Sequence, residues 1–424
     1  RAIMFGNQLG LRMGFFQNLV TPVVDMLGAI YPELIKQKEL IEKVIRSEEE
    51  AFGKTLDRGL ALLDRVTEDS TKHITGKAAF TLYDTYGFPL DLTQLIARER
   101  GLRVDTDGFD KAMKEQKKRS QDAQKKSLIE VVGDSNEEAT DFVGYDTINL
   151  KNYETRVRKV VKQDGISLVL LERTPFYAEM GGQIGDTGLL QTGPKSYLIK
   201  DTTRDPMCHV LHKIEDEVDF VIDEPVIVSV DFERRLAIQR NHSATHLMHH
   251  ALRQVLGTHL RQAGSIVTAS RLRFDFNHFE AVSPDQLKEI EGIVNQLIRQ
   301  NGLIKWYEVP YDDKPENVIA QFGEKYGDVV RVVDIGEYSL ELCGGTHSKA
   351  TGEIGFFKIL TESAIAAGTR RIEAIVGDTS LDYIEEQIGS LNEISNKLGC
   401  SPAEVTSHLE SLLKDKASLE KELK

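Results

Sequence analysis

The chain has 424 residues, of which 40% are hydrophobic and 28% are charged, and its formal net charge at pH 7 is -14. One hydrophobic core of ordinary size does not grow to this length, so we expect two to four domains, and the composition favours folded protein over disorder. The negative charge argues against a protein that binds nucleic acid through bulk electrostatics alone.

The cysteine content and the first residues of the chain indicate the cellular compartment of the protein. Cys208, Cys343 and Cys400 are odd in number and far apart, which favours a reducing compartment over a disulfide framework. We therefore expect a cytoplasmic protein, with an organellar matrix as the alternative. No apolar run is long enough to cross a bilayer, so no membrane partner is expected. The opening Arg1-Ala2 lacks a signal-peptide layout and predicts a piece of a longer protein.

The first 130 residues are predicted to form a helical domain, because apolar residues recur there at three- and four-residue spacing. No strand-like alternation is present. Gly87 and Pro89 interrupt the helical pattern, and Asp91 offers a cap for a new helix.

The next segment, residues 131–232, changes to β-rich sequence. Short β-branched runs separated by turn residues predict a small barrel or sandwich. The runs are residues 155–161, 166–171 and 226–230.

The remaining chain is predicted to hold an α+β domain over residues 233–378 and helices over residues 379–424, the second of them beginning at Pro402. The fold class is therefore multidomain α+β. Within 233–378 we expect helices at 234–256 and 284–300 and strands at 272–276 and 329–333.

Two segments carry residues that can share a metal ion. His242 and His246 stand four apart in a predicted helix, so their imidazoles project from one face. About a hundred residues later, Cys343 and His347 flank two glycines that let the backbone fold both side chains inward. Two histidines with a Cys-His pair form a natural zinc quartet, and we predict one Zn²⁺ on these four residues.

Other interpretations of these residues were weighed. A buried reduced cysteine with unrelated surface histidines remains possible. A metalloprotease is disfavoured, because Ser243 stands where a zincin helix carries its general-base glutamate. His209 and His212 are a weaker candidate site, since their segment alternates like a strand and lacks two further ligands nearby.

Four motifs give the chain a resemblance to alanyl-tRNA synthetases along essentially its whole length. One departure is Met180, where the family more often has serine, which leaves the role of that loop open. The motifs are residues 82–89, 174–186, 241–247 and 343–347.

The resemblance implies a specific domain order. A helical tRNA-recognition domain (1–130) precedes a β-barrel insertion (131–232), a zinc-containing editing domain (233–378) and the start of the C-terminal linker helices (379–424). It also implies that the class II aminoacylation core and the C-terminal dimerisation domain lie outside this chain. ATP would then serve only the full-length enzyme.

The implied function is hydrolysis of the ester in tRNA(Ala) mischarged with serine or glycine. Thr245 is expected at the edge of the metal pocket, where its hydroxyl contacts the serine side chain or bonds back to a helix carbonyl. Gln262 resembles a family editing residue that orients water or substrate, and Cys343 joins them as a catalytic candidate. The alternative is a non-catalytic tRNA-binding module with a structural zinc, since four protein ligands make a closed site.

The resemblance also implies contacts to tRNA. Asn7 and Asp84 are expected to read the acceptor-stem G·U pair, since amides and carboxylates pair with groups at the groove edge. Their ordinary alternatives are a turn residue and a helix cap. Arg261, Arg370 and Arg371 are expected to hold phosphates near the editing pocket, with a solvated face as the alternative.

Overall fold

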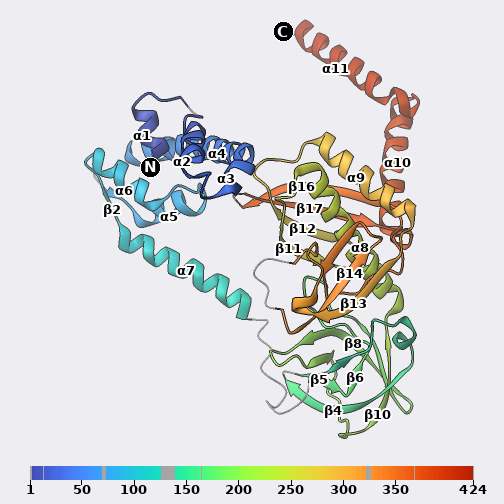
Figure 1. Cartoon of the computed structure of the whole chain (residues 1–424). Helices are drawn as coiled ribbons and strands as arrows, with labels where there is room; N and C mark the ends of the chain where they lie inside the picture. The colour runs from blue at the N-terminus through green and yellow to red at the C-terminus, as the bar shows by residue number, and fades with distance from the viewer. Residues whose placement is uncertain are drawn as a thin grey trace. The chain divides into compact units, whose positions relative to one another are not determined.

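The computed structural model describes residues 2–12, 14–68, 73–125, 139–163, 165–320, 326–366 and 368–423 (Figure 1). The chain separates into two compact units, Arg1–Glu130 and Val131–Lys424. Each unit has a hydrophobic core of its own. Over the described ranges, no helix has both the length and the apolar character needed to cross a membrane.

The first unit is mostly helical, as predicted. Phe88 lies in the predicted break and is fully buried. Gly59 lies in the helix Lys38–Glu68, and a Cβ there would be 2.2 Å from the Phe88 ring, so that position needs a glycine. Asp91 does not cap the following helix, which begins one residue earlier. The helices are α1 (Ala2–Gln8), α2 (Val20–Leu27), α3 (Pro32–Lys36), α4 (Lys38–Glu68), α5 (Gly76–Asp84), α6 (Leu90–Glu99) and α7 (Thr106–Lys125).

The first unit also holds two short strands where only helix was predicted. β1 (His73–Ile74) and β2 (Arg103–Val104) pair in parallel. Ile74 is fully buried in the helical core, so tertiary packing produces this pairing. Two residues are too few to show an alternating pattern in the sequence.

The second unit begins with a closed six-stranded barrel in the order β10-β4-β5-β9-β8-β7. Closure settles the choice between barrel and sandwich, and it leaves no exposed strand edge. The sequence located three of its strands. The barrel strands are β4 (Tyr153–Gln163), β5 (Ile166–Leu171), β7 (Gly188–Thr192), β8 (Lys195–Arg204), β9 (Val210–Ile214) and β10 (Pro225–Val230), and β3 (Asp141–Phe142) pairs with β6 (Arg173–Thr174) beside them.

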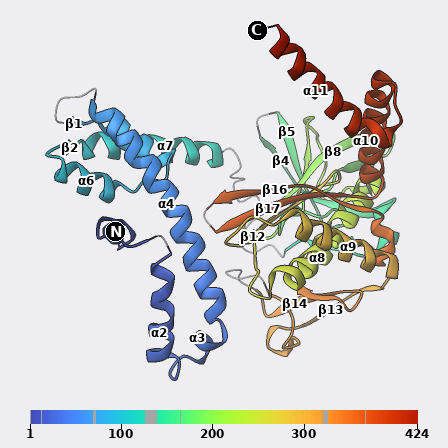
Figure 2. The same cartoon turned by 90° about the horizontal axis from the view of Figure 1, so that it is seen from above.

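An α+β region follows, in which α8 (Phe232–Leu256) and α9 (Pro284–Gln300) contact the sheet β11-β12-β17-β16 (Figure 2). A capping box of Ser283 and Gln286 begins α9, at the residue that the sequence predicted. The strands are β11 (Gln262–Val267), β12 (Leu272–Asn277), β16 (Phe357–Ala366) and β17 (Thr369–Val376), with a second sheet of β13 (Ile304–Pro310), β14 (Val329–Ile335) and β15 (Ser339–Leu342).

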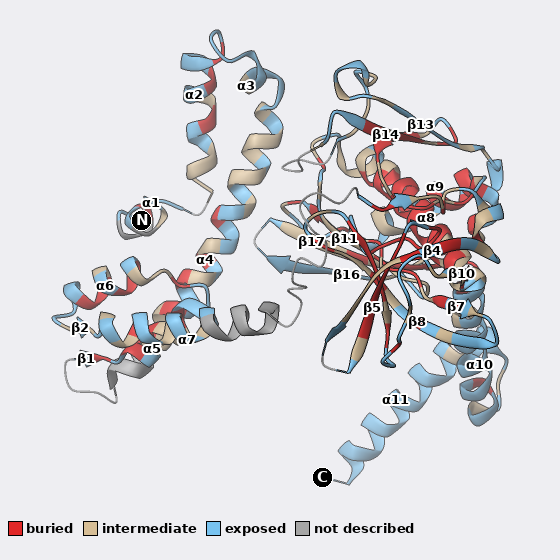
Figure 3. Cartoon of the chain, turned by 90° about the horizontal axis from the view of Figure 1, so that it is seen from below, coloured by how far each residue is buried: buried red, intermediate tan, exposed pale blue. Residues whose placement is uncertain are grey.

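Two helices end the described chain, α10 (Asp378–Leu398) and α11 (Val405–Glu422). The described residues of α11 are almost all exposed, whereas α8 is buried along most of its length (Figure 3). Because α8 carries two of the predicted ligands, burial fixes them on a rigid element.

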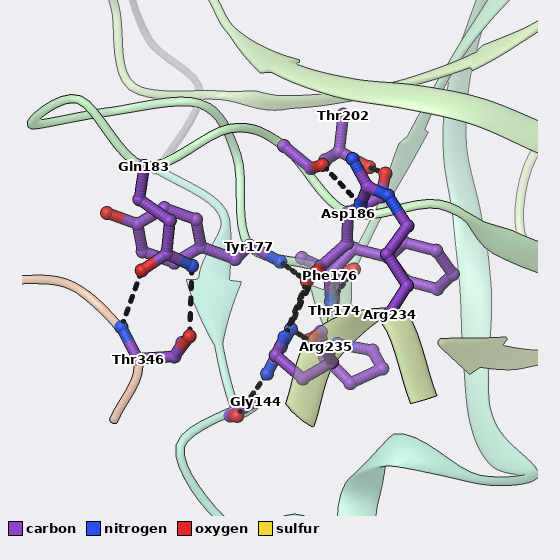
Figure 4. A network of polar contacts seen from close by, with 12 residues as sticks. Gly144, Thr174, Phe176, Tyr177, Gln183, Asp186, Thr202, Arg234, Arg235 and Thr346 are labelled. Carbon is purple, nitrogen blue, oxygen red and sulfur yellow. Dashed lines mark hydrogen bonds and ion pairs between the residues drawn. The ribbon is translucent and has the colours of Figure 1, made fainter. Parts of the chain in front are cut away.

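A buried ion pair joins the barrel to α8. Arg235 is fully buried, and its guanidinium bonds both carboxylate oxygens of Asp186 (Figure 4). Its remaining donors reach the carbonyls of Gly144 and Pro175 at 2.9 and 2.8 Å. Such a pair is costly to break, because removal of one partner leaves the other charged and buried.

His212 is a satisfied core residue of the barrel, and among the described residues it belongs to no group that could hold a metal ion. It is fully buried, its Nδ1 donates to the carbonyl of Val169 at 2.9 Å, and its Nε2 accepts from the Thr174 hydroxyl at 2.7 Å. Burial lowers the pKa of His212 to about 4. The neighbouring His209 bonds Asp205 at 2.9 Å.

This histidine makes stability depend on pH. Between pH 6.5 and pH 4 the unfolded chain binds a proton at His212 that the folded chain does not, so the free energy of unfolding falls as the pH falls. From pH 7.5 to pH 5 we predict that the wild type loses about 2 kcal/mol more than His212→Gln, which keeps a donor and an acceptor but does not titrate. Urea denaturation at the two pH values measures the difference. Equal losses in both proteins would contradict the prediction.

Candidate metal centre

Four side chains from two distant segments converge beside α8. His242 and His246 lie one turn apart on this helix, with stacked rings whose centroids are 5.3 Å apart. Cys343 and His347 lie in the loop that follows β15. One donor atom from each of the four lies within 4.8 Å of all the others. The structure therefore brings together the residues that the sequence proposed as a ligand set.

The two candidate ligands on α8 each have the ring nitrogen that faces away from the cluster occupied by an acceptor. The Nδ1 of His242 lies 2.8 Å from Oε1 of Gln183, a fully buried side chain of the barrel. The Nδ1 of His246 lies 3.1 Å from Oε2 of Glu341. An acceptor on Nδ1 keeps the proton there and leaves the Nε2 lone pair free for a metal.

The inner nitrogens face the thiol. Sγ of Cys343 lies 3.4 Å from Nε2 of both His242 and His347. Nε2 of His246 is buried without a hydrogen-bond partner among the described residues. In a tetrahedral zinc site, Zn–S and Zn–N bonds of the usual lengths place sulfur and nitrogen about 3.5 Å apart. The donor set and its spacing therefore fit zinc.

The electrostatics favour a thiolate. Burial opposes ionisation of Cys343, but His242 and His347 outweigh it and hold the thiol pKa well below its usual value. Burial likewise opposes ionisation of Glu341, but His246 holds the pKa of that carboxyl well below its usual value. Burial and the nearby His242 lower the pKa of His347 to about 3. A neutral imidazole at His347 and a thiolate at Cys343 are the protonation states that bind a metal. Against the effect of burial, the Glu341 carboxylate raises the pKa of His246 to about 10, so this imidazole must release a proton when a metal binds.

One cationic and one aromatic side chain hold the backbone of residues 343–347, which we name the metal loop. Nη1 of Arg331 donates to the carbonyls of Cys343 and Gly345, at 2.9 and 2.8 Å. The hydroxyl of Tyr145 donates to the carbonyl of Gly344 at 2.7 Å. Three consecutive carbonyls are therefore held, which orients the Cys343 side chain.

Two close approaches in the site require glycine. A Cβ on Gly345 would lie 2.0 Å from the ring of His242. In the barrel turn, Gly182 has a φ of +84°, and a Cβ there would lie 2.3 Å from the carbonyl oxygen of Ser265. The turn therefore packs directly on β11 and places Gln183 against His242.

A cavity of about 280 Å³ opens beside the ligands, and both Thr245 and Gln262 line it. The hydroxyl of Thr245 donates to the carbonyl of Asn241 at 2.8 Å, so the back-bonded alternative is present. Met180 and Tyr177 of the barrel also line the cavity, and Met180 Sδ accepts a bond from Arg204.

The residues proposed to contact tRNA lie in different places. Asn7 lies in α1, and its side chain is outside the described part of the chain. Asp84 is the last residue of α5, and its carboxylate accepts a bond from Gln116 at 2.5 Å, so it does not act as an N-terminal cap. Both residues belong to the first unit.

The three arginines differ in their surroundings. Arg370 makes a two-point ion pair with Glu362, at 2.5 and 2.6 Å. Arg371 makes the same kind of pair with Asp275, at 2.6 and 2.7 Å. Arg261 lines a separate cavity of about 220 Å³, which Gln262 also lines.

Sequence reasoning missed four residues that organise the site. Gln183 lies within the motif 174–186, and Glu341 lies two residues before the motif 343–347. Their polar side chains were the only sequence feature that could have drawn attention to them. Arg331 and Tyr145 stand outside every motif, and nothing in the sequence connects them to Cys343.

Comparisons with known proteins agree on one family. Residues 1–234 match tRNA synthetases class II (A), and residues 330–373 match the threonyl and alanyl tRNA synthetase second additional domain. The whole chain is 45% identical to an alanine–tRNA ligase of Opitutus terrae, covering 49% of that protein. It is 44% and 43% identical to those of Pseudoalteromonas translucida and Colwellia psychrerythraea, covering 50% and 49%. The chain spans about half the length of the curated relatives it matches.

The contact between Glu341 and His246 predicts metal affinity. We predict that Glu341→Gln weakens zinc binding by about 10- to 100-fold, because the substitution removes the charge that polarises the imidazole. Competition with a chromophoric chelator measures the dissociation constant. Glu289→Gln, at an exposed position on α9, is the matched control. Equal affinities in both variants would show that the carboxylate does not support a metal ligand.

Proposed function

The chain belongs to the alanyl-tRNA synthetase family, and we propose that it recognises tRNA(Ala) and hydrolyses the ester of its seryl and glycyl forms at the metal centre. Under this proposal, the ATP-dependent joining of alanine to tRNA is an activity of the full-length enzyme only. The observation that carries the proposal is the cluster of His242, His246, Cys343 and His347 beside a cavity that both editing candidates line.

The described side chains support selection against alanine. Because the Thr245 hydroxyl proton is directed to the carbonyl of Asn241, the lone pairs of its oxygen are left to accept a bond. A serine hydroxyl can donate that bond, whereas the methyl of alanine cannot. Sites that hydrogen-bond a substrate group discriminate strongly against analogues that lack it.

The remaining roles follow from position. Gln262 begins β11 at the cavity wall, where its amide can hold the attacking water or the ester carbonyl. Bound zinc would supply a Lewis acid that polarises the carbonyl or lowers the pKa of a water. The bonds from Arg331 to the carbonyls of Cys343 and Gly345 hold the part of the cavity wall that carries the Cys343 thiolate.

Contacts to tRNA are part of the same proposal. Asn7 and Asp84 would read the acceptor stem, and Arg261, Arg370 and Arg371 would contact phosphates. Arg370 and Arg371 would reach a phosphate only by leaving the carboxylates that now hold them.

Deacylation of seryl-tRNA(Ala) beside alanyl-tRNA(Ala) tests the proposal. We expect serine-selective hydrolysis that is lost in Cys343→Ala together with the metal. Thr245→Val should reduce the preference for the seryl ester by about 10-fold or more, since it removes one hydrogen bond. Thr361→Val, at an exposed position on β16, is the control and should leave the preference unchanged. Bound tRNA and bound metal without hydrolysis would instead support a recognition module whose metal is structural.

A further inference from the structure

A second cavity, of about 450 Å³, lies next to the metal loop and has no role in the proposed hydrolysis. Residues 346–349 line it, whereas residues 343–345 line the cavity of Thr245. Arg331 lines both cavities, so they are neighbours on either side of this residue. We name it the Trp306 cavity, and its walls include Tyr145, Phe232, Arg240, Trp306, Arg331 and Lys349.

An exposed indole forms part of the wall. Trp306 is 45% exposed although it is the largest apolar side chain in the sequence. The Arg331 guanidinium lies 4.6 Å from the Trp306 ring centroid and 4.0 Å from that of Tyr145. This packing holds the indole in one orientation and leaves nearly half of it open to a planar group.

Positive charge dominates the same wall, in a chain whose net charge is -14. Among the described residues, neither Arg331 nor Lys349 has a carboxylate within ion-pair distance, although the charge of Glu308 acts on Arg331. Nε of Arg331 is buried without a partner among these residues. Arg240 reaches only the exposed Asp378, at 3.6 Å. The single acid, Glu353, accepts a bond from the backbone N–H of Lys349. Cations beside an open aromatic ring complement phosphate and base together.

We propose that the Trp306 cavity binds an unpaired nucleobase of the RNA strand whose esterified end enters the cavity of Thr245. The base stacks on Trp306, and the adjoining phosphate lies beside Lys349. A paired base does not offer a free face, so the ligand is a single-stranded segment. The inference rests on the proposed function, because it deepens the choice of substrate at that site.

The chain offers a direct probe, because Trp306 is its one tryptophan. Titration of the wild-type chain with unacylated tRNA(Ala), which carries an unpaired 3′ end, should quench tryptophan emission saturably. The same RNA lacking its unpaired 3′ nucleotides should not quench it. Quenching by both RNAs, or by neither, would overturn the assignment of an unpaired base to this cavity.

Variants separate stacking from general damage. Trp306→Ala should weaken binding of a dye-labelled RNA about 10-fold and raise KM for the seryl ester more than it lowers kcat. Tyr307→Ala removes the next aromatic on β13, which is 39% exposed and does not line the cavity, and should change binding less than twofold. Lys349→Glu, at an exposed position, should lower the salt dependence of binding by about one phosphate contact. Equal effects of the two aromatic substitutions would overturn the inference.

The outcomes also separate this inference from the proposed function. Because the titration uses unacylated RNA, it measures binding without hydrolysis. Serine-selective deacylation without quenching would leave the proposed function standing and overturn the base site. Quenching in a chain that binds metal but does not deacylate would support the base site and contradict the editing activity.

Discussion

The site depends on one constraint: three imidazoles and a thiol must hold donor atoms within 4.8 Å of one another. Buried polar groups this close are unfavourable unless each has a partner, so the surrounding residues occupy every outer nitrogen. Gln183, Glu341 and Ser243 take these positions, the last at 3.3 Å from Nδ1 of His347. The inner nitrogens are thereby directed at the thiol.

Through Gln183, that arrangement makes the barrel part of the candidate metal centre. Gln183 comes from a barrel turn, and its amide also bonds the backbone and hydroxyl of Thr346 at 2.9 Å each. The buried pair of Arg235 and Asp186 fastens the same barrel to α8. The position of the His242 ring therefore depends on the barrel as well as on α8. Substitutions in the barrel should change the geometry of the four candidate ligands.

The sequence predicted the elements that have a periodic apolar pattern and the residues whose chemistry is uncommon. Helical spacing located α8 and α9, and β-branched runs located three barrel strands. Two histidines one helical turn apart and a Cys-His pair beside two glycines pointed to four candidate ligands, which the structure brings together. The sequence did not locate β7 or β8, where exposed Leu189 and Leu198 stand beside buried Leu190 and Ile199 and hide the alternation. Nor did it locate the β1–β2 pair, which tertiary packing creates. Arg331 and Tyr145 act on loop carbonyls, and backbone acceptors leave no trace in a sequence.

Zinc K-edge X-ray absorption on the purified chain tests the central claim most directly. The account predicts one zinc per chain with one sulfur ligand at about 2.3 Å and three nitrogen ligands at about 2.0 Å. The sulfur scatterer should disappear in Cys343→Ser while Gln183→Ala broadens the nitrogen shell. A chain that retains no zinc, or zinc without a sulfur ligand, would contradict the claim that these four residues form the metal centre.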